Sequence, residues 1–308
     1  MVTYSANFPE ALETRSKEWF FKNLTQLPLM FPMLFNRRPS TLAFEDRIRA
    51  AGLGVFQEKP EGTPVAFDDP LEGTRVRSTH AVYTLGYRVT WEAVEDDQWN
   101  ILSQMPGDLG DAMRDHMESI AWSLMNDAFT GAQFTGLDAL SLFNTAHTTL
   151  RPGVGTQSNS LSPAIDMSET GLQAAINVFR GMQSEEGRQL NVTPKKMVFH
   201  QNLQFASYVL LDTQYKPSSS DNDMNSVASS RSGITPLDSG GVPYLTSQTA
   251  WSLHGDVTGK NALIWYDRAR PFFERGRDAL SMDQLHWAGY RAHPAIGEWR
   301  THVGSNFA

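Results

Sequence analysis

The chain has 308 residues, no cysteine, and 26 lysines and arginines against 34 aspartates and glutamates, which gives a net charge of −8. The missing cysteines exclude a disulfide framework, an iron–sulfur cluster, thiolate-bound zinc and a cysteine nucleophile, and the acidic balance argues against tight nonspecific binding to nucleic acid. The length allows about two domains, and a charged fraction of only 19% indicates a surface that is either hidden against partners or rich in uncharged polar residues.

Residues 1–50 hold many aromatic side chains but show no sustained helical or strand period, and four prolines interrupt them. Aromatic side chains in an irregular segment need cover from water. Two interpretations remain open: the segment covers the chain's own core, or it is an arm that packs on a neighbouring subunit. The candidate subunit contacts are Trp19, Phe20, Phe21, Phe31 and Phe35.

The longest apolar run, residues 29–35, is far shorter than the ~20 residues of a membrane-spanning helix, and it contains Pro32. Acidic residues precede it, whereas a signal peptide begins with basic residues. The sequence therefore predicts a cytosolic product with no membrane partner.

Residues 54–92 have the composition of β structure. The run 82–91 is β-branched and aromatic with partial alternation, and turn-forming residues precede it. This pattern predicts a long two-stranded excursion, which is marginally stable by itself and must pack on another body. Its polar tip holds Lys59, Glu61, Asp68 and Asp69.

Residues 93–130 are predicted to form two helices. The first, about 92–104, stops at Pro106-Gly107, and the second begins with Asp108 as its N-cap. Apolar residues at i, i+3, i+4 and i+7 continue to Phe129 and predict a helix about 30 Å long. Met and aromatic residues at this spacing indicate a helix that faces a core.

Residues 136–165 are predicted to be a loop, and a compact α/β stretch follows with a helix capped by Ser168, a strand at 197–200 and a helix at 203–211. The serine-rich residues 217–241 predict a long surface loop. It holds the candidate contacts Asn222, Asp223 and Asn225. Further strands are predicted at 242–246, 262–265, 272–273 and 285–292. Because strands and helices mix without regular βαβ alternation, an α+β fold is favoured.

Motifs for chemistry are absent from the sequence. The stretch 254–261 is one residue too short for a phosphate loop, and Asn261 replaces the Ser or Thr that would bind magnesium. The histidines match no metal-ligand spacing, and no Gly-x-Ser-x-Gly motif is present. The sequence predicts no catalytic residues, no cofactor and no metal site.

Four separated motifs carry a resemblance to a known family. They are His80–Glu92 with Glu95-Asp96-Asp97, Asp138–His147 with Asn159, Gly187–Val198, and Asn222–Asn225 followed by Trp251. In this order the chain resembles the major capsid proteins of tailed bacteriophages, most closely the major head subunits of the phage Mu type. These proteins have the Johnson fold, which herpesvirus coats and encapsulins share. His200-Gln201 and Thr148 stand where such proteins often have proline, and these departures alter only local turns.

The resemblance implies an α+β Johnson fold in five parts. These are an N-terminal arm (1–50), an extended β-hairpin loop (51–92), a peripheral domain with a long spine helix (93–164), an axial domain (165–275), and return strands of the peripheral domain (276–308). The arm, the extended loop and the tip of the axial domain are expected to contact neighbouring subunits.

The implied function is that of a structural protein and not of an enzyme. It is a major capsid protein that assembles as hexamers and pentamers into the icosahedral shell around a double-stranded DNA genome. Assembly is expected in the cytoplasm of the bacterial host, and the product is the virion. Expected partners are other copies of the chain, packaged DNA through nonspecific inner-face contact, a scaffolding protein, a portal and a decoration protein. The alternatives are an encapsulin-type nanocompartment shell and a monomeric hydrolase.

Overall fold

The computed structural model describes residues 9–96, 102, 104–213, 215, 224–225, 227, 233–255 and 262–306. Its helices are α1 (Pro9–Gln26), α2 (Trp91–Glu95), α3 (Met105–Asn126), α4 (Glu169–Gly181) and α5 (Gln204–Leu211). Its strands are β1 (Phe35–Pro39), β2 (Phe44–Ala51), β3 (Leu71–Thr79), β4 (Ala81–Val89), β5 (Pro194–Phe199), β6 (Thr235–Pro236), β7 (Trp251–Gly255), β8 (Leu263–Arg277), β9 (Gln284–Ile296) and β10 (His302–Ser305). None of the helices in these ranges is long and apolar enough to cross a membrane.

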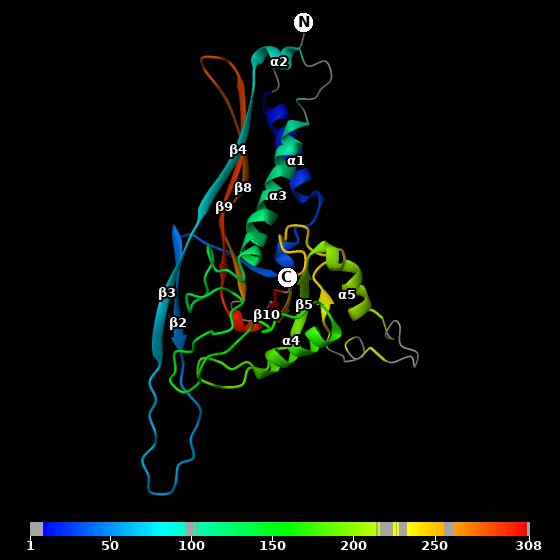
Figure 1. Cartoon of the computed structure of the whole chain (residues 1–308). Helices are drawn as coiled ribbons and strands as arrows, with labels where there is room; N and C mark the ends of the chain where they lie inside the picture. The colour runs from blue at the N-terminus through cyan, green and yellow to red at the C-terminus, as the bar shows by residue number, and fades with distance from the viewer. Residues whose placement is uncertain are drawn as a thin grey trace.

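The first sheet has the strand order β1-β8-β9-β4 in the described residues, with β1 parallel to β8 and the other pairs antiparallel. Helices α1 and α3 lie side by side along this sheet (Figure 1). Trp265 of β8 packs on Phe31, and Tyr83 of β4 packs on His116 of α3. The predicted long core-facing helix is confirmed as α3. It begins at Met105 instead of after Asp108, because Pro106 fits the first helical turn, where a missing N–H leaves no hydrogen bond unmade.

The second sheet has the order β10-β7-β5-β6 in the described residues and lies with α4 and α5 in the other body of the molecule (Figure 1). The predicted cap of α4 is confirmed, since Ser168 Oγ accepts a hydrogen bond from Gly171 N at 3.2 Å. Leu172, Ala175 and Phe179 on one face of α4 are buried. The strand predicted before His200 and the helix predicted at 203–211 are confirmed as β5 and α5.

A hairpin extends from the body (Figure 1): β2 pairs with β3 from Phe44↔Thr79 to Ala51↔Leu71, and residues 52–70 connect them. The prediction that the run 82–91 is the second strand of this excursion is wrong. Residues 81–89 form β4, which pairs with β9 in the first sheet. The excursion therefore covers residues 44–79 and begins within the predicted arm.

The prediction that residues 1–50 lack regular structure is also wrong, because α1, β1 and most of β2 fall in this segment. Among the α1 side chains that the structure describes, from Arg15 on, Phe20 and Leu24 are buried, whereas Trp19 and Lys22 are exposed. Two buried positions four residues apart, followed by prolines, give too weak a period for recognition in the sequence.

In the C-terminal half, the bounds of several strands and the sheet to which they belong differ from the prediction. The strands predicted at 262–265 and 272–273 are one strand, β8, and it lies in the first sheet although the axial domain was expected to extend to 275. β9 pairs with β8, but β10 pairs with β7 in the second sheet, so the last residues do not all return to the first. Residues 242–246 form no strand beyond one bridge between His200 and Val242. Most of the helix predicted at 92–104, beyond α2, and residues 256–261 lie outside the described residues.

Candidate assembly surfaces

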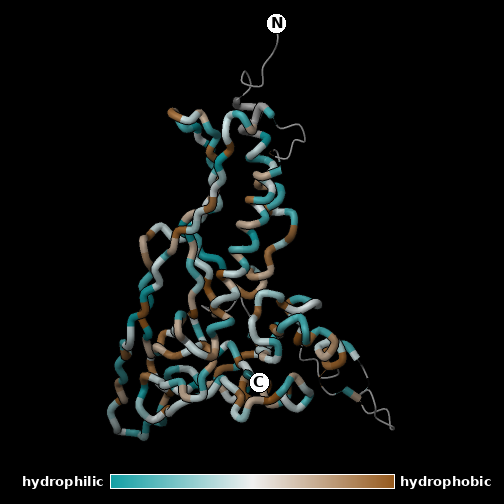
Figure 2. The backbone as a smooth tube through the Cα atoms, turned by 45° about the horizontal axis from the view of Figure 1, so that its top comes forward, coloured by the Kyte–Doolittle hydropathy of each residue, from teal (hydrophilic) through white to brown (hydrophobic). Residues whose placement is uncertain are grey.

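The connection between β2 and β3, residues 52–70, exposes apolar side chains without cover from its own chain. Phe56 and Phe67 are 103% and 95% exposed. Leu53, Val55 and Val65 are also more than half exposed. The connection extends beyond the other elements in Figure 1, and Figure 2 shows hydrophobic and hydrophilic residues intermixed along it. Several exposed apolar groups on one segment mark an interaction surface.

Polar contacts hold the base of this connection. Asp68 accepts hydrogen bonds from Arg151 Nη1 at 2.7 Å and from Gly54 N at 2.6 Å. The hydrogen bond from Arg151 is the largest cause that lowers the pKa of Asp68. Glu186 accepts from Gly52 N at 2.7 Å. Burial raises the pKa of Glu186, but hydrogen bonds from Ser184 and Gly52 outweigh it and lower that pKa to about 2.

A buried charge network fastens the hairpin to the body. Glu185 Oε1 lies 2.8 Å from Arg49 Nε of β2 and 3.0 Å from Arg300 Nη2 near the C-terminus. Its other oxygen accepts from Leu150 N at 2.9 Å. Burial raises the pKa of Glu185, but the hydrogen bond from Arg49 and the charge of Arg300 lower it overall. One carboxylate thus joins β2, the loop after α3 and the C-terminal segment.

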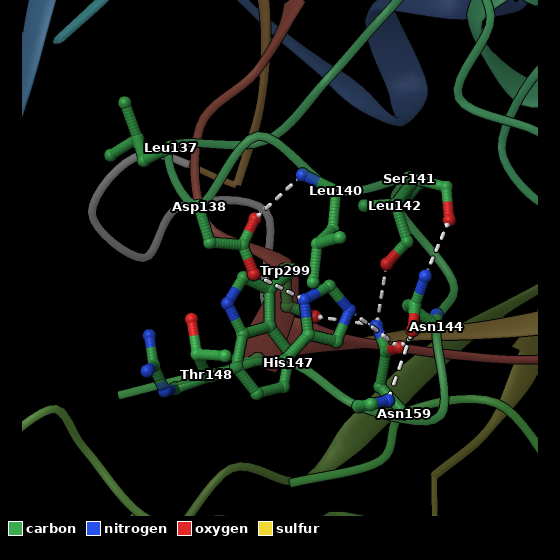
Figure 3. Close-up of polar contacts among 12 residues, drawn as sticks. Leu137, Asp138, Leu140, Ser141, Leu142, Asn144, His147, Thr148, Asn159 and Trp299 are labelled. Carbon is green, nitrogen blue, oxygen red and sulfur yellow. Dashed lines mark hydrogen bonds and ion pairs between the residues drawn. The ribbon is translucent and has the colours of Figure 1, made fainter. Parts of the chain in front are cut away.

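The second sequence motif forms a buried polar cluster (Figure 3). His147 Nδ1 contacts Asp138 Oδ2, and His147 Nε2 lies 3.0 Å from Asn159 Oδ1. Asn159 Nδ2 donates to the carbonyl oxygens of Leu142 at 2.7 Å and His302 at 3.1 Å. Burial raises the pKa of Asp138, but the hydrogen bond and the charge of His147 outweigh burial and lower it.

This cluster has the residue types of a catalytic site, but its side chains are not accessible to solvent or to a substrate. The side chains of Asp138 and His147 have no accessible surface, and His147 stacks on Trp299 with ring centroids 3.8 Å apart. Both ring nitrogens already have partners, so the histidine is held in place and cannot meet a substrate. The cluster joins the loop after α3 to the C-terminal segment. The described residues contain no group of three His, Asp or Glu side chains that could hold a metal ion.

The aromatic residues predicted to contact a neighbour divide into two groups. Phe20, Phe31 and Phe35 are at most 1% exposed, and Phe21 packs against the same core. Phe20 contacts Phe273, and Phe35 contacts Trp122, so for this group the structure supports the interpretation that the segment covers the chain's own core. Trp19, at 39% exposed, keeps surface for a neighbour and stays a predicted contact.

The predicted polar contacts are similarly divided. Lys59, Glu61 and Asp69 are exposed on the connection 52–70, whereas Asp68 pairs with Arg151. Asn225 is 5% exposed and donates to the carbonyl oxygens of Leu210 in the last turn of α5 and of Thr213 after it, so its amide stabilises the chain itself. Asn222 and Asp223 lie outside the described residues.

The sequence reasoning missed one exposed helix face. Phe205, Tyr208 and Val209 of α5 are 80%, 61% and 38% exposed and share a face by their spacing. The sequence could have indicated this face, because the residues of α5 are apolar on nearly all sides of the helix. A short surface helix of this kind is expected to pack against another domain or subunit.

Comparison with known proteins identifies the family. The phage capsid protein family model matches residues 73–303. No curated protein matches the sequence significantly.

Solved capsid structures share the fold. A procapsid of bacteriophage JBD30 is similar with a TM-score of 0.53 at 15% identity, covering 99% of this chain and 77% of that chain. The capsid of a native GTA particle gives a TM-score of 0.56 at 11% identity, covering 92% and 91%. The capsid of cyanophage P-SCSP1u gives 0.56 at 9% identity, covering 90% and 87%. The family match favours a capsid subunit over the encapsulin alternative. The mixed sheets and helices of the chain agree with the α+β capsid fold. The chain belongs to the phage capsid protein family.

Proposed function

We propose that this chain is the main shell subunit of a tailed-phage head of the Mu type, arranged as hexamers and pentamers around packaged double-stranded DNA. The observation that carries the proposal is the connection 52–70, whose fully exposed Phe56 and Phe67 have no cover within the chain. A neighbouring subunit that covers them provides the packing that a lone hairpin lacks. Many copies of one such contact close a shell, because each weak contact is repeated around every ring.

The parts of the chain have proposed places in the shell. The hairpin β2–β3 is the extended loop that lies on a neighbour. The first sheet with α3 is the peripheral domain, and α3 is its spine helix. The second sheet with α4 and α5 is the axial domain, and the exposed face of α5 contacts the next subunit around the ring axis. Trp19 is the proposed contact of the N-terminal segment.

The proposal includes partners and excludes catalysis. Packaged DNA contacts the inner face of the shell nonspecifically and without tight binding, because a subunit with a net charge of −8 does not adhere to DNA phosphates. A scaffolding protein, a portal and a decoration protein complete the head, which assembles in the host cytoplasm. No enzymatic step is assigned, since the one triad-like cluster described, Asp138–His147–Asn159, is closed to solvent.

The first test is assembly of the full chain, alone and with the scaffolding protein of its own phage. Light scattering after size-exclusion chromatography should report particles far larger than the 34.4 kDa subunit, and negative-stain images should show closed shells. A stable monomer that never assembles under either condition overturns the proposal.

A loop variant links assembly to the proposed contact. The double substitution Phe56→Ser and Phe67→Ser should abolish shells but leave the unfolding free energy of the subunit unchanged, because neither side chain is buried within the chain. The matched control, Phe56→Leu with Phe67→Leu, keeps the surface apolar and should retain shells. Equal shell yields from both variants would contradict the assignment of this loop.

A further inference from the structure

Strand β4 forms an open edge of the first sheet. Its nine residues, Ala81–Val89, pair with β9 on one side, and no strand among the described residues pairs with the other side. β4 runs along the side of the sheet away from α1 (Figure 1). The outward N–H and C=O groups of an edge strand are a template on which another strand can pair.

The other edge strands that the structure describes are protected against such pairing. β1, at the opposite edge of the first sheet, has only five residues and includes Arg37, Arg38 and Pro39. The edge strands of the second sheet, β6 and β10, have two and four residues. β2 and β3 carry four and three charged side chains. Short length, proline and charge are the usual means by which proteins keep an edge unpaired.

β4 has none of these protections. It is nine residues long, contains no proline, and carries one charged residue, Arg88. The guanidinium of Arg88 is already held by its own chain, since Nε donates to Asp283 at 2.5 Å and Nη2 donates to Asp278 at 2.9 Å. The edge of β4 is therefore free of the charge that would repel a partner strand.

Exposed apolar side chains accompany this open edge. Val82 and Leu85 are 62% and 59% exposed. Tyr83 packs on His116 of α3, so Leu85, two residues further along the strand, faces the same side of the sheet as α3. α3 packs chiefly over β9, the neighbour of β4, and leaves Leu85 uncovered.

The sequence of β4 is nearly symmetric about Leu85. If two β4 strands pair antiparallel with Leu85 opposite Leu85, then Tyr83 lies opposite Tyr87 and Ala81 lies opposite Val89. Directly opposite aromatic and apolar side chains stabilise a sheet. A contact across a twofold axis requires a surface that complements itself, and β4 meets this requirement.

We propose that β4 pairs antiparallel with β4 of a second copy of this chain, with the twofold axis at Leu85. The two four-stranded sheets then join into one continuous sheet of twice the width. This inference rests on the proposed shell function, because the shell supplies the second copy. The contacts that close a ring of subunits are heterologous, whereas this contact is isologous. The β4 pair therefore joins one ring to the next.

The joined sheet has room for both copies of α3. Neighbouring strands lie about 4.8 Å apart, so the two β9 strands, with two β4 strands between them, lie about 14 Å apart. Helices packed side by side need about 8–10 Å between their axes. Because α3 lies over β9, the two α3 helices do not collide, and the paired Leu85 side chains lie between them.

Cysteine cross-linking tests the pairing directly. The chain has no cysteine, so one substitution gives one thiol per subunit. Shells assembled from Leu85→Cys chains and treated with a short thiol-specific cross-linker should give covalent dimers, because directly opposite Cβ atoms lie about 5 Å apart. Denaturing gels measure the dimer, and peptide mass spectrometry should find position 85 joined to position 85.

Val82→Cys is the matched control, since Val82 lies on the same strand with similar exposure. In the proposed register Val82 lies opposite Arg88, so the two copies of position 82 stand six residues apart along the strand, about 20 Å. Shells of this variant should therefore give no covalent dimer. Monomeric Leu85→Cys chains in treated shells, or equal cross-linking of both variants, would overturn the inference.

Charge at the axis provides a second test. Leu85→Lys and Leu85→Glu should each lower shell yield by about tenfold or more, because like charges then meet at the twofold axis. An equal mixture of the two variant chains should recover much of the yield, since opposite charges also meet. The unfolding free energy of each unassembled variant should match that of the unaltered chain, because Leu85 is exposed. Normal assembly of either variant alone sinks the inference.

Other partners for β4 give different results. A decoration protein, or a neighbour within the same ring, would cover the edge without bringing position 85 to position 85, and the absence of that link overturns the inference. If the unaltered chain forms shells but the Leu85→Cys shells do not cross-link, the inference fails while the proposed function stands. Failure of the unaltered chain to form any shell counts against the proposed function itself.

Discussion

Gly110 of α3 lies directly against Phe20 of α1: a Cβ atom at position 110 would stand 2.5 Å from the Phe20 carbonyl oxygen. One turn earlier, a Cβ on Gly107 would stand 2.6 Å from Asn23 Nδ2. The two glycines let the helices approach closely, and this approach holds the narrow apolar stripe of α1 over the sheet.

Gly110→Ala is therefore expected to destabilise the subunit. The added methyl group meets backbone, which cannot move aside as a side chain could, and overpacking of this kind costs about 1–3 kcal/mol. Urea denaturation of the unassembled subunit measures the loss. In the matched control, Gly181→Ala at the end of α4, the new Cβ has no neighbour within 4 Å, so stability should not fall. Equal stability of both variants would contradict the packing of α1 on α3.

Asn159→Asp tests the buried cluster with a change of almost no volume. Asn159 Nδ2 donates to the carbonyl oxygens of Leu142 and His302, and an aspartate would turn an oxygen toward both. One oxygen would keep Asn144 N and His147 Nε2 as neighbours, but the other would face carbonyl oxygens with no donor, and we expect a loss of about 3 kcal/mol in unfolding free energy. The control, Asn202→Asp, changes an exposed amide and should alter stability little. A loss below about 1 kcal/mol at position 159 would refute the buried cluster.

The elements that the sequence predicted well are those whose signals are local. The cap of α4 at Ser168, the strand β5 and the long stripe of α3 each depend on residues within a few turns of one another. Local propensity and period suffice for these elements because no distant partner determines them.

The elements that the sequence missed depend on distant partners. β2 carries Glu45, Asp46, Arg47 and Arg49 in eight residues, so it lacks the apolar alternation of a strand. Its charges are matched elsewhere in the chain: Arg49 pairs with Glu185, 136 residues away, and Asp46 pairs with Arg75 and Arg77. The exposed loop at 52–70 was predicted from its turn residues, but the burial of Phe31 was not, since Phe31 packs on Trp265, which is more than 200 residues away in the sequence.

The buried histidine pair predicts how stability depends on pH. His254 Nδ1 and His302 Nδ1 lie 2.7 Å apart, so one ring must donate to the lone pair of the other. Burial lowers the pKa of His302 to about 3 and that of His254 well below 6.5. The unfolded chain, with a histidine pKa of about 6.5, therefore binds protons that the folded chain does not.

The stabilising contribution of this neutral pair to the unfolding free energy should thus be complete above pH 6.5. It should fall as the pH decreases from 6.5 toward about 3, where His302 also protonates in the folded chain. Each histidine contributes a loss of about 1.4 kcal/mol per pH unit in this window. Denaturation at pH 7 and pH 5 measures the difference. His302→Gln should reduce it, whereas the control His200→Gln keeps both rings and should retain it. A wild-type stability that is the same at both values would contradict the buried neutral pair.

Glu185→Gln should loosen the hairpin from the body. Arg49 and Arg300, with side chains 7% and 4% exposed, would lose the carboxylate that lies between them. Removing one partner of a buried ion pair leaves uncompensated charge and costs about 3 kcal/mol. Hydrogen exchange should quicken in β2 and at the amide of Leu150, which donates to Glu185. The control Asp46→Asn removes a half-buried carboxylate from the same hairpin and should leave the exchange of Leu150 unchanged. If Glu185→Gln and Asp46→Asn behave alike, Glu185 does not fasten the hairpin, because the ion pairs of Asp46 with Arg75 and Arg77 lie within the hairpin itself.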